Sequence, residues 1–290
     1  MKNILLPTDF SNNAWNAIFT GLKMFETIDC NFILLNTYEP KLANLMGNKS
    51  KERLGVIFDS LSENSKLQLD KTMQYLIENH SRSNHKFELA SISNDIEHAI
   101  NQMVADRDID LIIMGTKGAT GAKEIFMGSN TVKVIKKVRS CPIIAVPHDY
   151  DFKALKSVVF PTDFTHPYSK SELKPLIDVV SLWNAEIFIL QIAQEYELHD
   201  DQKRNLEQLS KRLQDVKHSF NKVEMWNNVA EATNKFVDEN EMDLIALIHY
   251  PHTFMEKLTR EPVIRKIGFH AKVPLMVLSL IHISEPTRLV

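Results

Sequence analysis

Short apolar runs alternate along the whole chain with longer stretches whose hydrophobic residues recur every three or four positions. Continuous apolar runs are typical of parallel strands that are buried on both faces and joined by crossover helices. In the first half the runs predict strands at 3–7, 31–37, 86–91, 110–115 and 142–147. The longer stretches predict helices at 12–28, 52–80, 95–107 and 129–139, the first capped by Ser11 or Asn12 and the third by Asn94 or Asp95.

The same order of runs occurs a second time. Lys2–Phe10 reads KNILLPTDF and Lys156–Phe164 reads KSVVFPTDF, while DLIIMG from Asp110 is matched by DLIALI from Asp243. The second set of strands is predicted at 157–161, 185–192, 222–226, 243–248 and 273–279. We therefore expect two tandem doubly wound α/β domains, each a five-stranded parallel sheet with helices on both faces.

The boundaries of these domains follow from the repeat. We expect domains at 1–149 and 154–281, joined by the polar stretch HDYDFKA that begins at His148. Residues 283–290 have no counterpart in the first copy, and Pro286 interrupts their pattern. We interpret them as a disordered tail or a foreign extension.

Composition narrows the classes of partner. A formal net charge of −3 over 290 residues gives no reason to expect nucleic acid or an anionic membrane as a partner. No apolar run approaches the roughly 20 residues that span a bilayer, and no secretory leader is evident, so we expect a cytoplasmic protein. Cys30 and Cys141 lack metal-site spacing and are expected to be free thiols, buried or half-buried.

Half of the glycines lie in one short stretch. GTKGATGAKEIFMGS, from Gly115 to Ser129, holds four of the eight glycines. This stretch follows the fourth predicted strand, so in a doubly wound sheet it faces the Pro7-Thr8-Asp9 turn after the first strand. Gly118 and its neighbours would let backbone N–H groups approach a phosphate, and Gly128-Ser129-Asn130 opens a helix whose N-terminus favours an anion.

The glycine spacing differs from the Walker pattern and from the dinucleotide fingerprint, neither of which is present. The spacing G-x2-G-x9-G-[ST] instead resembles the ATP-binding motif of the universal stress protein family. This resemblance covers nearly the whole chain. It implies two domains of strand order 3-2-1-4-5 that pair through their fifth strands, with ATP bound in the first.

The resemblance also implies roles for individual residues. Gly115, Gly118, Gly128 and Ser129 would hold the phosphates, with Asn130 close by and Met114 adjoining them. Pro7, Thr8 and Asp9 would line the adenosine end, with Asp9 near the ribose or a bound magnesium ion. Asn36 and Thr37 would border the adenine. Lys117 and Lys123 are equally well explained as phosphate contacts or as solvated lysines.

The second copy has lost the motif. Ile248, Pro251 and Glu261 or Pro262 stand where the first copy has its three motif glycines. Proline has no N–H group to donate, and a glutamate would repel a phosphate, so we expect nucleotide binding in the first half only. Since the same fold manages without these glycines, we attribute them to a ligand rather than to the architecture. His249 and His252 are expected to be exposed loop residues rather than metal ligands.

Two classes of function fit this site. The first is a nucleotide-responsive regulator in stress or growth arrest, whose occupancy by ATP changes its conformation or its choice of an unknown protein partner. The alternative is a slow ATPase or phosphotransferase. An electron-transfer flavoprotein-like protein or a related nucleotide hydrolase of similar topology fits the glycine spacing less well. No catalytic residue is assigned, because the sequence offers one carboxylate, Asp9, without an evident paired base or arginine finger. Whether two chains form a homodimer stays open.

Overall fold

The computed structural model describes residues 1–39, 51–80, 82, 84–116, 127–193, 197–224, 228–248 and 272–279, without the side chains of 51–54 and 193. The chain divides into two compact units. The first comprises Met1–Val138 and Ile144–Lys153, and the second comprises Arg139–Ile143 and Ala154–Val290. The expected pairing of the domains through their fifth strands stays a prediction, and the expected tail at 283–290 lies outside the described residues.

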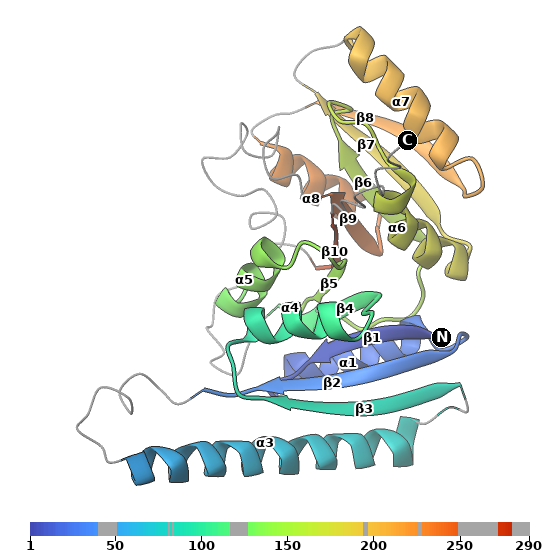
Figure 1. The fold of residues 1–290 in the computed structure, drawn as a ribbon. Coiled ribbons are helices and arrows are strands. Elements are labelled where there is room, and N and C mark those ends of the chain that lie inside the picture. Colours follow the sequence, from blue (N-terminus) through green and yellow to red (C-terminus); the bar gives the residue numbers. More distant parts are fainter. Residues whose placement is uncertain are drawn as a thin grey trace, which may run out of the picture. The chain divides into compact units, whose positions relative to one another are not determined.

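The first unit alternates strands and helices (Figure 1). Its elements are β1 (Lys2–Pro7), α1 (Asn12–Met24), β2 (Cys30–Thr37), α3 (Lys51–His80), β3 (His85–Ile92), α4 (Ile96–Asp106), β4 (Leu111–Gly115), α5 (Ser129–Lys137) and β5 (Ile143–Val146). Its strand order is β3-β2-β1-β4-β5, and β1 pairs in parallel with both β2 and β4. From β1 the chain adds β2 and β3 on one side and then β4 and β5 on the other, so the strand order reverses between β1 and β4.

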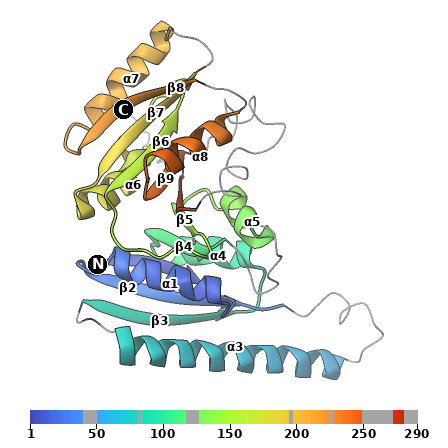
Figure 2. The same ribbon diagram turned by 180° about the vertical axis from the view of Figure 1, so that it is seen from behind.

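Strand order decides which face each helix covers. Right-handed crossovers that run outward in opposite directions from β1 place their helices on opposite faces. On one face, Trp15 of α1 accordingly packs edge-to-face against Tyr75 of α3, and Phe19 packs against His80 with the two rings tilted. The helices α4 and α5 pack together on the other. Figures 1 and 2 show α1 and α4 on opposite sides of the sheet.

The second unit repeats this order. Its elements are β6 (Ser157–Thr162), α6 (Lys170–Trp183), β7 (Glu186–Ala193), α7 (Asp200–Arg212), β8 (His218–Glu224), α8 (Val229–Glu239), β9 (Leu244–Ile248) and β10 (Leu275–Leu278). Its strands follow the order β8-β7-β6-β9-β10, and every pair with a described register is parallel. The predicted fold class, a doubly wound α/β domain of strand order 3-2-1-4-5, is confirmed.

Several predicted boundaries were wrong by a few residues. Helix α1 ends at Met24 rather than at 28. The side-chain amide of Asn84 donates hydrogen bonds to the carbonyls of Glu26 and Ile28 at 3.2 and 2.7 Å, and these bonds hold the residues after Met24 in a turn. Strand β8 begins at His218 rather than at 222. It lies at the edge of its sheet and reads HSFNKVE, so no continuous apolar run marks where it starts.

The core of each unit lies between its strands and helices. Strands β1 and β9 are buried almost throughout, with Ile4, Leu5, Leu244 and Ile245 fully enclosed. Cys30 and Cys141 are free and buried, as predicted, and burial raises the pKa of the Cys30 thiol to about 11. Among the described helices, none has both the length and the apolar character needed to cross a bilayer.

An aspartate before the fourth strand is built into both units in the same way. Asp110 accepts a hydrogen bond from the backbone N–H of Asn3 at 2.8 Å. Asp243 accepts from the backbone N–H groups of Lys156 and Ser157 at 2.8 and 2.9 Å, and from the Ser157 hydroxyl at 3.0 Å. The match between DLIIMG and DLIALI therefore has a structural cause, which is the attachment of the fourth strand to the start of the first.

We expect Asp243→Ala to lower the stability of the second unit by about 2 kcal/mol, because two backbone donors and the Ser157 hydroxyl lose a charged acceptor. Asp243→Asn keeps one acceptor oxygen and should recover part of the loss. The measurement is native-state hydrogen exchange of the β6 and β9 amides, since a chain of two units need not unfold in one step. Equal exchange in wild type and Asp243→Ala would contradict this role.

Candidate functional site

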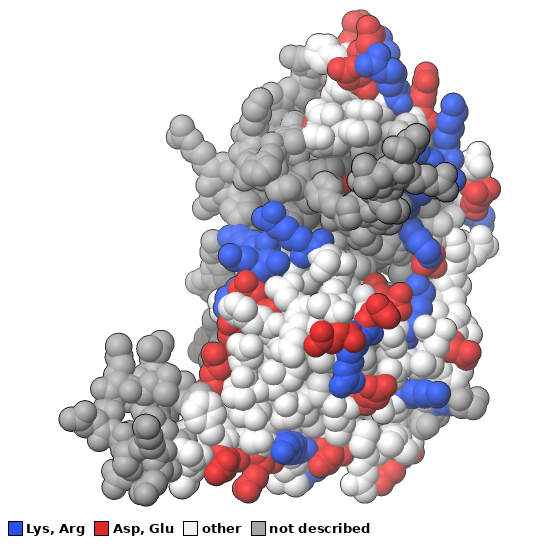
Figure 3. Space-filling view, viewed as in Figure 1, with Lys and Arg blue, Asp and Glu red and all other residues white. Residues whose placement is uncertain are grey.

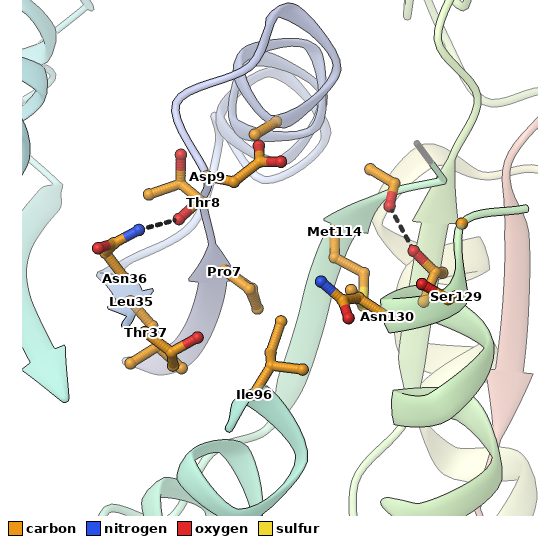
Figure 4. A pocket seen from close by; sticks show the side chains of 14 residues that line it. Pro7, Thr8, Asp9, Leu35, Asn36, Thr37, Ile96, Met114, Ser129 and Asn130 are labelled. Carbon is orange, nitrogen blue, oxygen red and sulfur yellow. Dashed lines mark hydrogen bonds between the residues drawn. The ribbon is translucent and has the colours of Figure 1, made fainter. Parts of the chain in front are cut away.

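A cavity lies at the carboxyl ends of the strands of the first unit, beside the reversal between β1 and β4. Its volume is about 280 Å³, near the lower end of the range typical for small-molecule sites. The lining residues come from β1, β2, β4 and the starts of α1, α4 and α5 (Figure 4). They are Pro7, Thr8, Asp9, Ala14, Leu35, Asn36, Thr37, Ile96, Met114, Gly115, Gly128, Ser129, Asn130 and Thr131.

The predicted residues largely meet here, although this does not test what they bind. Ten of the predicted residues line the cavity, namely Pro7, Thr8, Asp9, Asn36, Thr37, Met114, Gly115, Gly128, Ser129 and Asn130. Lys117 and Gly118 lie outside the described residues. Sequence reasoning missed Ala14, Leu35, Ile96 and Thr131. Ala14, Ile96 and Thr131 lie in the first turns of α1, α4 and α5, and Leu35 lies two residues before the end of β2. A position in a first helical turn or at a strand end on the carboxyl side of the sheet is the signal that could have found them.

The turn after β1 is fixed by its own side chains. The Thr8 hydroxyl accepts from the N–H of Phe10 at 3.0 Å, and the Asp9 carboxylate accepts from the N–H of Ser11 at 3.1 Å. Phe10 has φ of 63°, in the left-handed region. The amide nitrogen of Asn36 donates to the Thr8 carbonyl at 2.7 Å (Figure 4), so the end of β2 holds this turn in place.

The same turn exists in the second unit. Thr162 accepts from the N–H of Phe164 at 3.1 Å, Asp163 accepts from that of Thr165 at 3.0 Å, and Phe164 has φ of 58°. Pro-Thr-Asp therefore has a structural role in both copies. The motif ends the first strand and therefore does not by itself report a ligand.

The packing of the fold requires a glycine at position 115, which the sequence interpretation missed. A Cβ atom at Gly115 would lie 2.7 Å from Cγ, 2.8 Å from Oδ1 and 2.9 Å from the backbone oxygen of Asn13. Helix α1 thus approaches β4 too closely for any side chain. Asn13 is buried and also donates to the carbonyl of Val146 at 3.2 Å. The attribution of this glycine to a ligand alone was wrong, because packing already requires it.

The second unit tolerates Ile248 at the corresponding position because its helix starts later. The register of β1 with β4 and of β6 with β9 makes Gly115 and Ile248 equivalent. Helix α1 begins at Asn12, four residues after Thr8, whereas α6 begins at Lys170, eight residues after Thr162. The first turn of α1, which carries Asn13, therefore has no helical counterpart in α6.

Helix α5 presents an uncapped N-terminus to the cavity. Gly128 is its N-cap, supplies no capping side chain, and is followed by a first turn without acidic residues. By contrast, Ser11 and Asp95 cap α1 and α4 with their side chains. The Thr131 hydroxyl donates to the carbonyl of Gly115 at 2.8 Å and joins α5 to the end of β4. Backbone N–H groups and the positive end of the helix dipole thus face the cavity.

The start of α4 carries a cluster of charges beside the cavity. Asp95 accepts from the N–H groups of Glu97 and His98 at 2.9 and 3.3 Å, contacts the His98 ring, and accepts from Lys133 of α5 at 3.2 Å. Partial burial raises the pKa of Asp95, but the hydrogen bonds from His98, Lys133 and Glu97 outweigh it and lower this pKa to about 2. Asp95 therefore stays ionised at any physiological pH.

In the second unit, side chains cover the turn that corresponds to the Pro7-Thr8-Asp9 turn of the first unit. Tyr168 is buried, and its hydroxyl contacts that of Thr162. Gln202 and Asn205 of α7 donate to the carbonyls of Asp163 and Phe164 at 2.7 and 2.8 Å. The turn after β6 is thus covered by protein side chains. His249, Pro251, His252, Glu261 and Pro262 lie outside the described residues.

Comparison with known proteins relates this chain to one family. A model of the universal stress protein family matches residues 1–147, which is more than half of the 290 residues. The chain belongs to the universal stress protein family. Universal stress protein MJ0577 from Methanocaldococcus jannaschii is 30% identical over 158 residues, which cover 50% of this chain and 94% of the relative.

Solved structures agree in fold. A universal stress protein from Archaeoglobus fulgidus has a TM-score of 0.67 at 17% identity and covers 96% of each chain. Protein PA1789 from Pseudomonas aeruginosa has a TM-score of 0.59 at 10% identity, with 96% of this chain and 92% of that chain covered. At these identities the likeness shows the fold alone, so any function has to be argued from the site.

We expect Gly115→Ala to destabilise the first unit of this universal stress protein by about 1–3 kcal/mol, because a backbone oxygen blocks the added Cβ. The free energy of opening is measured by hydrogen exchange of the β4 amides. In Asn13→Ala, Gly115→Ala the combined loss should be smaller than the sum of the single losses, since the side-chain part of the clash is relieved. Gly55→Ala is the control, because nothing lies within 4 Å of its added Cβ and it should stabilise α3 slightly.

The charge of Asp95 should stabilise the fold in a defined pH window. Its folded-state pKa of about 2 lies below the ordinary value of 3.8, so the contribution is present above pH 4 and is lost as the pH falls toward 2. We expect Asp95→Asn, which keeps a capping oxygen, to cost about 1 kcal/mol at pH 7 and progressively less between pH 4 and pH 2. Native-state hydrogen exchange of the α4 amides in the Glu97→Gln background measures this difference, because Asp95 is then the one carboxylate of the two that still faces Lys133. A difference that is constant across this window would contradict the assignment.

Proposed function

We propose that the first unit binds ATP, or a related adenine nucleotide, in the cavity, and that occupancy makes this universal stress protein a regulator in stress or growth arrest. One observation carries the proposal. The cavity lies at the strand reversal of a doubly wound sheet, and the uncapped N-terminus of α5 opens onto it. The glycine motif that resembles the family's ATP-binding motif ends at this helix, at Gly128 and Ser129.

The α5 side of the cavity suits a phosphate chain. Ser129 and Asn130 are exposed and offer backbone N–H groups together with a hydroxyl and an amide. A first turn without a carboxylate leaves these donors to a bound anion rather than to a capping side chain. Phosphate groups commonly bind in such an arrangement because the helix dipole adds to the hydrogen bonds.

The part of the cavity between β1, β4 and the start of α4 suits a planar base. The side chains of Pro7, Ile96 and Met114 point toward one another across the cavity (Figure 4). Thr37 lies beside them at the end of β2 and adds a hydroxyl group. Apolar side chains with a few polar groups are the usual lining of a site that takes an aromatic ring. We infer that the adenine lies here and that the phosphates extend toward α5.

Asp9 fits a magnesium ion that arrives with the nucleotide. Asp9 is the carboxylate among the residues that line the cavity, and its side chain is exposed. Within the described residues, no three His, Cys, Asp or Glu side chains form a group that could hold a metal by themselves. Magnesium is commonly held by one or two carboxylates together with substrate phosphates. Asp9 would supply the carboxylate, and the ion would neutralise charge between the phosphates.

The second unit is proposed not to bind nucleotide in this manner. Tyr168 stands against Thr162, whose counterpart Thr8 lines the cavity of the first unit. Two side chains from α7 donate hydrogen bonds to the carbonyls of the same turn. Together with the loss of the motif glycines from the sequence, these contacts favour binding by the first half alone.

Calorimetry with ATP and magnesium tests the proposal on the full chain. We expect one site per chain, and we expect Ser129→Glu to weaken binding at least tenfold, because a carboxylate would occupy the first turn of α5. The same carboxylate should leave stability unchanged or improve it, since an acidic side chain favours a helix N-terminus. Loss of affinity without loss of stability distinguishes a ligand effect from misfolding.

A matched control is available in the second unit. Ser171→Glu makes the same substitution in the first turn of α6, and we expect it to leave ATP affinity unchanged. Wild-type protein that gives no heat with ATP, or equal affinity of Ser129→Glu and wild type, would overturn the proposed site. Single-turnover phosphate release from the same samples decides the alternative: turnover within minutes that Asp9→Ala abolishes would establish a slow ATPase.

A further inference from the structure

We propose that Lys133 is a positioning residue for the nucleotide site: its ion pairs to Asp95 and Glu97 fix the N-terminus of α5 against the start of α4. This inference rests on the proposed function, because it assigns a role in the same cavity. Nothing in the glycine motif points to Lys133, which lies four residues after Ser129 in the sequence. Its partners belong to another helix.

The contacts join the first turn of α4 to the second turn of α5. The ammonium nitrogen of Lys133 lies 3.2 Å from Asp95 Oδ1 and 3.5 Å from Glu97 Oε2. Both carboxylates are half-buried, with exposed side-chain fractions of 24% and 15%, against 44% for Lys133. An ion pair with two partners and limited exposure is held in one geometry more firmly than a single pair in open water.

The carboxylate of Asp95 is itself fixed in position. Asp95 is the N-cap of α4, and its Oδ1 atom, which contacts Lys133, also accepts from the N–H of Glu97. The low pKa of Asp95 shows that the ionised form is favoured by these contacts. Lys133 therefore contacts an acceptor whose place is set by the backbone of α4.

The two helices form facing parts of the cavity wall. Ile96, between the two carboxylates in sequence, lines the cavity from α4, while Ser129 and Asn130 line it from α5 (Figure 4). Lys133 thus spans from the wall that suits the base to the wall that suits the phosphates. We call these contacts of Lys133, Asp95 and Glu97 the clamp. A small displacement of α5 would move N–H donors away from a bound phosphate, and such displacements are costly.

A simpler role for Lys133 predicts the opposite result for one variant. Lysines gather on α5 (Figure 3), which carries Lys133, Lys136 and Lys137 and no acidic residue. If Lys133 acted only by attracting an anion, neutralising Glu97 would strengthen nucleotide binding, because a negative charge near the site is removed. If the clamp positions α5, the same change weakens binding. The sign of the effect therefore separates the two roles.

The decisive measurement is calorimetry of ATP binding to Glu97→Gln in the full chain. We expect about threefold weaker affinity than wild type, and a similar loss in Lys133→Met with recovery in Lys133→Arg. Asp106→Asn is the matched control, because it removes one negative charge from the opposite end of α4. It should bind as tightly as wild type or slightly more tightly. Unchanged or tighter binding by Glu97→Gln would overturn the positioning role.

Hydrogen exchange measured without nucleotide tests the clamp independently of ATP binding. The amides of residues 132–137 should exchange faster in Glu97→Gln and Lys133→Met than in Asp106→Asn, because α5 loses its attachment to α4. Equal exchange in all three variants would overturn the clamp whether or not ATP binds. Failure of wild-type protein to bind ATP would instead overturn the proposed function, and with it the role of the clamp in nucleotide binding.

Discussion

The close approach of α1 to β4 is the constraint on which the site of this universal stress protein depends. Asn13 lies so near Gly115 that no side chain fits between them, and the same asparagine holds the carbonyl of Val146 at the end of β5. Through this contact the turn after β1, the end of β4 and the end of β5 are placed relative to one another. The cavity is the space left at the carboxyl end of the sheet between these segments.

The two units show what this contact adds to a common fold. Both end their first strand with the same Pro-Thr-Asp turn, and both attach their fourth strand through an aspartate. They differ in where the next helix begins. The later start of α6 admits Ile248 in place of Gly115 and brings Tyr168 onto the turn. One architecture thus supports a cavity in the first unit, whereas side chains cover the corresponding turn of the second.

The cavity combines two kinds of wall because two helices start beside it in different ways. Helix α4 begins with an aspartate that satisfies its own N–H groups, so its first turn contributes an apolar side chain, Ile96. Helix α5 begins with a glycine that satisfies none, so its first turn contributes donors. Lys133 joins the charged cap of one helix to the body of the other. The capping of each helix therefore determines what its end of the cavity can bind.

Sequence alone determined the fold class, the order of elements and most residues of the cavity. Buried parallel strands leave continuous apolar runs, and in a doubly wound sheet residues after the first and fourth strands must meet. The start of β8 was misjudged because no apolar run marks it, and the end of α1 was misjudged because Asn84, far away in sequence, fixes the turn. Only the tertiary structure decided why Gly115 is a glycine, that Ile96 reaches the cavity and that Lys133 contacts α4. Each of these depends on the distance between elements that are remote in the chain, which periodicity and spacing do not encode.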